Sequence, residues 1–455
     1  KTTLAHQIMF ALANPEKKAL FFTVLGEPPI KMLRYQQQYS FFDIEKVGAS
    51  IKYINLADDL RTGDFNAVLD RIIFEVEAYS PGLVFVDSFR SVVQTGKGGN
   101  EGIADLQHFV QELGTRMASW QATTFLIGEY VNPEAEANPI LTVADGLITL
   151  AQNIDDNSVV RKIRIVKMRG QAHMAGYHTF RISGNGLHVY PRLLPPLAAD
   201  RHPGVPLDEN PRRISLGFPQ LDAMLNGGLP SGHSVLVVGP TGAGKTVLST
   251  AFLAEGAARG ETGVIARFEK GTSRLRNALL ARLVQSGQVA VVENRSMDLS
   301  VEQLLDDLIN TVQRTQATRV VIDSLSELGL YFAPEFKQDF RESVFRILSA
   351  LAKTGASVVV TLGLEDRFTD MRFSHSDISF LTDAVIVMRY VEVEAQLKKL
   401  ISVVKVRGSA HSHDLRQYEI TEKGLELGNR MSQYEGLLSG HPSAVKHPDR
   451  SDRQP

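Results

Sequence analysis

Residues 239–246 read Gly239-Pro240-Thr241-Gly242-Ala243-Gly244-Lys245-Thr246 and fit the phosphate-loop pattern G-x-x-x-x-G-K-[ST]. The apolar run before them, residues 234–238, is typical of a buried parallel strand, and apolar residues recur at helical spacing from 247 to 259. This context predicts a tight loop at a helix N-terminus, where backbone N–H groups and Lys245 bind phosphate and Thr246 binds Mg²⁺. The alternative is a glycine-rich turn that binds nothing, and the flanking strand and helix favour the phosphate loop.

The beginning of the chain repeats the end of this loop, because Lys1-Thr2-Thr3-Leu4 matches Lys245-Thr246-Val247-Leu248. Residues 84–88 likewise match 321–324, and Lys167-Met168-Arg169-Gly170 matches Lys405-Val406-Arg407-Gly408. The matched positions are 244, 236 and 238 residues apart, a register that unrelated motifs would not keep. We therefore expect an internal duplication in which Lys1 and Thr2 bind nucleotide in the first copy, while that copy's loop glycines and opening strand would precede Lys1.

Each copy alternates short β-rich runs with helical patterns, which predicts an α/β fold with a mostly parallel sheet flanked by helices on both faces. Three strand-like stretches close each copy and lie close enough in sequence to form antiparallel hairpins at one edge of the sheet. In the first copy we expect strands at 19–25, 52–56, 83–88 and 123–127, and helices at 65–79 and 103–119. In the second we expect strands at 264–268, 289–292, 319–324 and 357–362, edge strands at 383–391, 397–406 and 415–420, and a helix opened by the capping box Ser300-x-x-Gln303.

The length of 455 residues suggests about two or three domains. We expect a first domain at 1–192, a proline-rich linker at 193–212, a second domain at 213–436 and a disordered polar tail at 437–455. Lys+Arg 49 against Asp+Glu 51 leaves a net charge of −2, so composition gives no general reason to expect nucleic acid or a membrane as partner. No apolar run approaches the ~18 residues that span a bilayer. The absence of cysteine suits a reducing compartment, and we expect a cytoplasmic protein.

Acidic residues follow the buried strands at the positions that a phosphate loop requires. Asp323 and Asp87 end apolar runs and are candidates to hold Mg²⁺ together with the loop threonines Thr246 and Thr2. The alternative is that each aspartate caps the next helix. Glu269 and Glu27 end another strand in each copy and are candidates to orient or deprotonate the nucleophile, and the alternative is an ordinary solvated glutamate.

Two basic residues end a late strand in each copy, Lys405 with Arg407 and Lys167 with Arg169. Their i, i+2 spacing on a strand turns both side chains to the same face. An ammonium beside a guanidinium suits the γ-phosphate charge of a nucleotide bound to a neighbouring subunit. The alternatives are an exposed hairpin face and a basic edge for nucleic acid.

With these residues the chain resembles the KaiC family, bacterial clock ATPases with two RecA-type domains in one chain. The resemblance also includes the lead-in at 221–232, residues 382–386, and His173 or His411 after each Lys-x-Arg-Gly stretch. It implies two tandem RecA-like P-loop NTPase domains, and ATP with Mg²⁺ at the subunit interfaces of a double-ring homohexamer. It further implies ATP hydrolysis in the first ring, Ser/Thr autophosphorylation in the second with Glu269 as general base, and signalling or clock partners that the sequence does not identify.

The chain departs from the family pattern at the phosphorylated pair, an adjacent Ser-Thr that reads Ser379-Phe380 here. The resemblance leaves Ser379 as the candidate phosphoacceptor, with Ser376 and Thr382 as nearby hydroxyls. Where the family has two adjacent glutamates, this chain keeps one in each copy, so the two sites are expected to differ in rate or role. Likeness to the family ends at Leu438-Ser439-Gly440, so binding of the clock's activating partner at the tail is not expected.

Two other functions are compatible with the same core. One is a DNA-dependent ATPase of the RecA or helicase type, which the balanced charge disfavours. The other is a signalling scaffold that assembles on ATP with little turnover, which the single acid in each site would allow.

Overall fold

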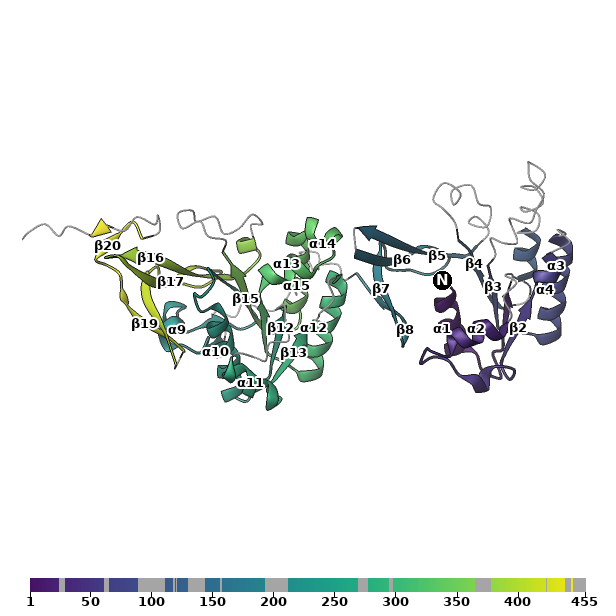
Figure 1. Ribbon diagram of the computed structural model, residues 1–455, viewed down its shortest axis with the longest axis horizontal. Helices are drawn as coiled ribbons and strands as arrows, with labels where there is room; N and C mark the ends of the chain where they lie inside the picture. The colour runs from purple at the N-terminus through teal and green to yellow at the C-terminus, as the bar shows by residue number, and fades with distance from the viewer. Residues whose placement is uncertain are drawn as a thin grey trace, which may run out of the picture. The chain divides into compact units, whose positions relative to one another are not determined.

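The protein is described from a computed structural model over residues 1–23, 29–60, 65–88, 111–117, 119, 121–129, 144–155, 158–192, 212–268, 277–293, 298–364, 378–422, 424–437 and 443–444. The chain divides into two units, one with residues 1–153 and 161–192 and the other with residues 154–160 and 193–455 (Figure 1).

A nine-stranded sheet forms the centre of the second unit, in the order β13-β12-β14-β15-β11-β16-β17-β18-β19. The strands from β13 to β16 are parallel, and β16 to β19 run antiparallel at one edge, which confirms the expected α/β fold with antiparallel edge hairpins. The strands are β11 (Ser234–Gly239), β12 (Gly263–Arg267), β13 (Val289–Glu293), β14 (Arg319–Asp323), β15 (Ser357–Gly363), β16 (Ala384–Val393), β17 (Gln396–Val406), β18 (Arg416–Thr421) and β19 (Gly424–Arg430). Short pairs are made by β9 (Arg213–Ile214) with β10 (Leu229–Pro230) and by β20 (Tyr434–Glu435) with β21 (Ser443–Ala444).

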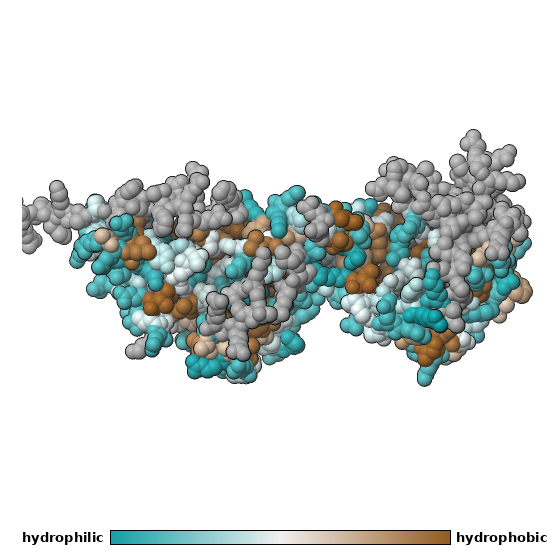
Figure 2. Space-filling model, viewed as in Figure 1, coloured by the Kyte–Doolittle hydropathy of each residue, from teal (hydrophilic) through white to brown (hydrophobic). Residues whose placement is uncertain are grey.

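Helices cover both faces of this sheet because alternate strand residues point to opposite sides. Val320 packs with α12, α13 and α15 in one core, and its neighbour Val321 packs with α9, α10 and α11 in the other. On the face visible in Figure 2 the exposed apolar residues form small separate groups, as expected when the cores are enclosed. The helices are α9 (Pro219–Met224), α10 (Lys245–Ala258), α11 (Ala278–Gln285), α12 (Val301–Thr315), α13 (Leu325–Tyr331), α14 (Pro334–Gln338) and α15 (Phe340–Ala352), with a 3₁₀ turn η3 (Ile378–Phe380).

The first unit repeats this plan in two four-stranded sheets, β2-β1-β3-β4 and β5-β6-β7-β8. In the second unit β11 joins the matching parts by pairing with both β15 and β16. Among the described residues of the first unit no strand takes that place. Its elements are α1 (Thr2–Leu12), β1 (Ala19–Thr23), α2 (Pro29–Gln36), η1 (Ile44–Lys46), β2 (Ile51–Asn55), α3 (Ala57–Leu60), α4 (Phe65–Tyr79), β3 (Leu83–Asp87), β4 (Thr123–Ile127), β5 (Gly146–Asp155), β6 (Ser158–Met168), β7 (His178–Ser183) and β8 (Gly186–Tyr190).

Two expectations about the ends of the copies need correction. Each copy closes with four strands rather than three, because β8 and β19 were missed; the two glycines of β19 weaken the strand pattern there. The tail expected to be disordered from 437 begins with a residue that is 4% exposed, Leu437, and it contains β21, which pairs with β20 before the tail. Of the helix expected at 103–119, residues 103–110 lie outside the described residues and 111–117 are helical.

Candidate functional site

The loop at 239–246 joins the buried end of β11 to the first turn of α10, as its sequence predicts. Gly242 and Gly244 have φ angles of 81° and 97°, in the left-handed region that side chains with a Cβ disfavour. Gly244 is also the N-cap of α10. The backbone therefore turns sharply at the positive end of the helix dipole, where an anion is stabilised.

The side chain of Lys245 turns back toward the start of the loop. Its Nζ donates to the carbonyl oxygens of Gly239 at 2.7 Å and Pro240 at 2.9 Å. Burial lowers the pKa of Lys245, while the charges of Asp323 and Glu327 act in the opposite direction and raise it. The strands β11 and β14 both pair in parallel with β15, so the loop that carries Lys245 and the end of β14 at Asp323 lie at the same edge of the sheet.

Asp323 ends β14 and is held by the neighbouring strand. Its Oδ1 accepts a hydrogen bond of 2.5 Å from the Thr361 hydroxyl of β15. The cap of the following helix α13 is Ser324, whose Oγ accepts from the Glu327 N–H at 3.4 Å, so the alternative that Asp323 caps this helix is wrong. Thr246 is exposed at the start of α10.

The first unit brings its matching residues into direct contact. The Thr2 hydroxyl donates to Asp87 Oδ2 at 2.6 Å, and Lys1 Nζ lies 3.6 Å from Glu129 Oε1. Burial raises the pKa of Asp87, and the hydrogen bond from Thr2 lowers it. A hydroxyl beside a carboxylate is a pair of oxygen ligands of the kind that Mg²⁺ takes. The peptide bond after the aspartate is cis in both units, at Asp87-Ser88 and Asp323-Ser324.

The basic pair of the second unit points toward η3. Lys405 Nζ donates to the Ser379 carbonyl at 3.0 Å, and the Arg407 guanidinium donates to the Phe380 carbonyl at 2.6 Å. Arg407 also lies 3.7 Å from Asp383. Burial lowers the pKa of Lys405, and the neighbouring charge of Arg407 lowers it further.

The first unit repeats one contact of this basic pair, that of Arg407 with Asp383. Arg169 forms an ion pair of 3.1 Å with Asp145, the position that matches Asp383. Lys167 is partly buried near the end of β6, one residue before Met168.

Ser379 is half-buried in η3, and its carbonyl is also within 3.3 Å of the Thr382 hydroxyl. The Phe380 ring is 42% exposed and lies 4.3 Å from the Arg341 guanidinium. Thr382 is fully buried, so it is poorly placed to substitute as a phosphate acceptor. Ser376 and the two candidate general bases, Glu27 and Glu269, lie outside the described residues.

Sequence reasoning missed Tyr418, whose hydroxyl donates to the carbonyl of Ala243 in the loop at 2.6 Å. The sequence does hold an aromatic residue at the matching position of the first copy, Phe180, 238 residues earlier, the same separation as between Lys167 and Lys405.

The described residues contain no cluster of three or more His, Cys, Asp or Glu that could hold a metal. Among them, no helix combines the length and apolar character needed to cross a membrane.

Comparison with known proteins gives a consistent result for both units. A family model described as "ATPase: KaiC" matches residues 1–193 and 214–432. The chain is 28% identical over 396 residues to the circadian clock oscillator protein KaiC of Picosynechococcus sp., covering 86% of this chain and 74% of that protein. It is 26% identical to the KaiC of Rippkaea orientalis and 27% identical to KaiC 1 of Synechocystis sp., covering 99% of this chain and 87% of each relative. Because the family model matches both copies of the repeated unit, the chain belongs to the KaiC family of ATPases.

Proposed function

We propose that the second unit binds Mg·ATP at the loop of residues 239–246 and hydrolyses it. The observation that carries this proposal is the position of Lys245 after β11 and of Asp323 at the end of β14, parallel strands that both pair with β15 and so end at one edge of the sheet, beside a loop whose glycines have left-handed backbone. The loop N–H groups would hold the phosphates, and Mg²⁺ when bound would neutralise charge on the β- and γ-phosphates. Thr246 and Asp323 would hold the metal, and Glu269 would orient or deprotonate the nucleophile.

The first unit would carry a second site of the same kind. Thr2 and Asp87 already share a hydrogen bond and would hold Mg²⁺, Lys1 would bind phosphate, and Glu27 would take the place of Glu269. Because Asp87 accepts from its loop threonine whereas Asp323 accepts from Thr361, the metal ligands are arranged differently in the two units. This difference supports unequal rates at the two sites.

The basic pairs would act across subunit interfaces. In the proposed double-ring homohexamer, Lys405 and Arg407 would leave the carbonyls of η3 and approach the γ-phosphate of a neighbouring subunit, and Lys167 and Arg169 would do so in the first ring. A permanently charged guanidinium stabilises charge that develops during phosphoryl transfer. The exposed ion pair of Arg169 with Asp145 is weakly held in water, which supports such an exchange of partners.

Autophosphorylation would take place on Ser379, with Glu269 as general base for its hydroxyl. The location of Ser379 in a turn that contacts both Lys405 and Arg407 supports this role, because their charges would stabilise an added phosphate. The names of the relatives support a function in signalling or timing, with clock partners still to be identified, and we propose a cytoplasmic location.

The nucleotide site is tested with Lys245→Ala. We expect ATP affinity at the second unit to fall about 10- to 100-fold because the loop loses its main cation, as measured by isothermal titration of the full chain. Lys353→Ala, an exposed lysine at the end of α15, is the matched control and should bind ATP as the unchanged chain does. Full ATP affinity in Lys245→Ala would refute the proposed loop.

The kinase activity is tested by incubation with γ-³²P-ATP and mapping of the labelled residue. We expect label on Ser379 and its loss in Ser379→Ala, while ATP hydrolysis continues. Phosphate release without label would indicate an ATPase alone, and neither label nor release would indicate a scaffold. Strong stimulation of hydrolysis by single-stranded DNA would instead favour a DNA-dependent ATPase.

A further inference from the structure

Two carbonyl groups of the loop at 239–246 contact tyrosines of the antiparallel edge strands. Tyr418 of β18 is 1% exposed, and its hydroxyl donates to the carbonyl oxygen of Ala243 at 2.6 Å. A Cβ added to Gly244 would lie 3.0 Å from Ile420 of the same strand. On β16, the Tyr390 hydroxyl lies within 3.5 Å of the Thr241 carbonyl. The loop therefore packs against β16 and β18, two strands whose residues lie outside the G-x-x-x-x-G-K-[ST] pattern.

The hydrogen bond from Tyr418 determines the direction of one particular backbone N–H. In a planar trans peptide the C=O and the following N–H point in opposite directions. Because the Ala243 carbonyl points toward Tyr418 of β18, the Gly244 N–H points in the opposite direction, away from β18. This N–H belongs to the group of loop amides that a phosphate chain would contact at the start of α10.

Both sides of this contact are suited to a lasting hydrogen bond. Burial raises the pKa of the Tyr418 hydroxyl, with Tyr390 adding to the effect, so the hydroxyl stays protonated and remains a donor. Ala243 is also only 1% exposed, so water cannot easily replace the hydroxyl if it is removed. Glycine on the other side of the peptide allows many backbone conformations, which makes an external restraint useful at this position.

The first unit provides an internal comparison. Phe180 of β7 matches Tyr418 of β18 at the separation of 238 residues that also relates the two basic pairs. Phe180 is buried in the same way, at 6% exposed, and has no hydroxyl. An aromatic ring therefore fits this position in both units, and the hydroxyl is an addition found in the second unit alone.

We propose that Tyr418 is a positioning residue of the second nucleotide site. Its hydroxyl holds the Ala243–Gly244 peptide so that the Gly244 N–H faces the phosphates of the bound nucleotide. The restraint makes this site bind nucleoside di- and triphosphates more tightly than a site with phenylalanine at the same position. The inference rests on the proposed function of the loop.

The test is Tyr418→Phe in the full chain. We expect the dissociation constants of ATP and ADP at the second site, and KM for ATP, to rise about fivefold to tenfold. The turnover number at saturating ATP should stay unchanged, because the residue contacts neither nucleophile nor leaving group. The variant should fold, since the substitution keeps the buried ring and removes one hydroxyl, and its urea unfolding curve checks this. Replacement of Tyr418 by p-aminophenylalanine restores a donor and should return KM toward its original value.

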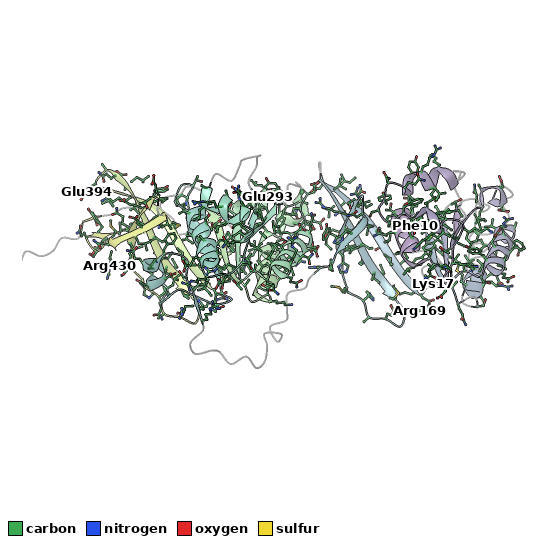
Figure 3. The ribbon with its side chains drawn as sticks, turned by 90° about the horizontal axis from the view of Figure 1, so that it is seen from below. Phe10, Lys17, Arg169, Glu293, Glu394 and Arg430 are labelled. Atoms are coloured by element: carbon green, nitrogen blue, oxygen red, sulfur yellow. The ribbon has the colours of Figure 1, made fainter. Side chains whose placement is uncertain are left out.

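The matched control is Tyr434→Phe. Tyr434 donates a hydrogen bond of the same 2.6 Å length to Glu394, which is labelled in Figure 3, and its ring packs against a cluster separate from the one that contains Tyr418 and Ala243. KM should not change in this variant. The second-site signal is the ATP binding that Lys245→Ala weakens; if Lys245→Ala weakens none, the proposed function fails. If Lys245→Ala weakens it but Tyr418→Phe binds ATP as tightly as the unchanged chain, the positioning role alone fails.

Discussion

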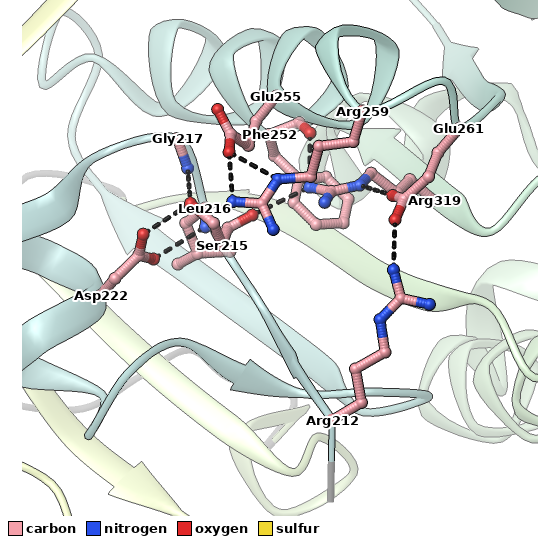
Figure 4. A network of polar contacts seen from close by, with 10 residues as sticks. All are labelled: Arg212, Ser215, Leu216, Gly217, Asp222, Phe252, Glu255, Arg259, Glu261 and Arg319. Atoms are coloured by element: carbon pink, nitrogen blue, oxygen red, sulfur yellow. Dashed lines mark hydrogen bonds and ion pairs between the residues drawn. The ribbon is translucent and has the colours of Figure 1, made fainter.

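At the scale of single residues, Arg319 shows how the second unit tolerates a buried charge. The side chain is 1% exposed, and its guanidinium pairs with Glu261 at 2.6 Å and donates to the carbonyls of Ser215 and Phe252, each at 2.8 Å (Figure 4). Arg212 contacts the same glutamate from the outside at 3.0 Å. A buried cation persists only when it is paired and hydrogen-bonded in this way. Arg319 of β14 is thereby joined to Ser215 and to α10.

This arrangement predicts that Gly256 cannot be enlarged. A Cβ at Gly256 would lie 2.5 Å from Cδ and Nε of Arg319, whose guanidinium is held by its partners. We expect Gly256→Ala to lower the unfolding free energy by about 1–3 kcal/mol, measured by urea denaturation. Gly329→Ala in α13 is the control, since its Cβ would meet Phe340 at an ordinary 3.5 Å. It should be neutral or slightly stabilising, and equal effects of the two substitutions would contradict the explanation.

His6 makes the first unit sensitive to acid. It is fully buried and stacks on Phe21, and burial lowers its pKa from 6.5 to about 4. Below pH 6.5 the unfolded chain takes up a proton here while the folded chain does not, so stability falls as the pH decreases toward 4. The loss amounts to roughly 3 kcal/mol at full effect.

The measurement uses the fluorescence of Trp120, the one tryptophan of the chain, which belongs to the first unit. We expect the unfolding midpoint in urea to fall from pH 7 to pH 4.5, and to fall less in His6→Met. Burial raises the pKa of Asp87, which therefore also titrates in acid, but it is present in both proteins and cancels in the comparison. The same pH dependence in both proteins would exclude His6 as the cause.

At the scale of elements, capping explains where α12 begins. Ser300 is its N-cap and accepts a hydrogen bond from the Gln303 N–H at 3.1 Å, so the start expected from the capping box is confirmed. The helix ends at Gln316, which has left-handed backbone with φ 51°. Between these ends, Leu304, Leu305 and Leu308 are fully buried against the sheet.

We expect Ser300→Ala to lower the unfolding free energy of the second unit by about 1 kcal/mol, because the first turn loses its side-chain acceptor. Ser300→Asp should keep most of the stability, since a carboxylate accepts the same bond and suits the positive end of the helix. Urea denaturation followed by far-ultraviolet circular dichroism measures both variants. Destabilisation of Ser300→Asp by as much as Ser300→Ala would show that packing of the serine, rather than its cap, matters.

At the scale of the whole molecule, the duplication places one basic pair in each unit. If Arg407 acts on the nucleotide of a neighbouring subunit, then Arg407→Ala and Glu269→Gln should each impair ATP turnover while leaving nucleotide binding largely intact. Mixing the two variants should restore about a quarter of the activity, because a quarter of randomly formed head-to-tail interfaces combine an intact Glu269 with an intact Arg407.

The control is the double variant Arg407→Ala/Glu269→Gln, which should stay without second-site activity alone. Mass in solution with and without Mg·ATP shows whether mixed oligomers form. Oligomers that mix without regaining activity would indicate that each site is complete within one chain.

The amino-acid sequence by itself determined the repeated α/β plan, the tight loop between β11 and α10 and the position of β4 and α4 to the residue, because these depend on local patterns of apolar residues, glycines and caps. It also indicated that Thr2 and Asp87 lie close together as candidate Mg²⁺ ligands, since the loop threonine and the end of a neighbouring parallel strand meet at one edge of the sheet. Only the tertiary structure decided which side chains form hydrogen bonds with the loop carbonyl of Ala243 and with the Asp323 carboxylate. Tyr418 and Thr361 reach their partners across 175 and 38 residues of chain, and no local pattern encodes contacts between strands so far apart.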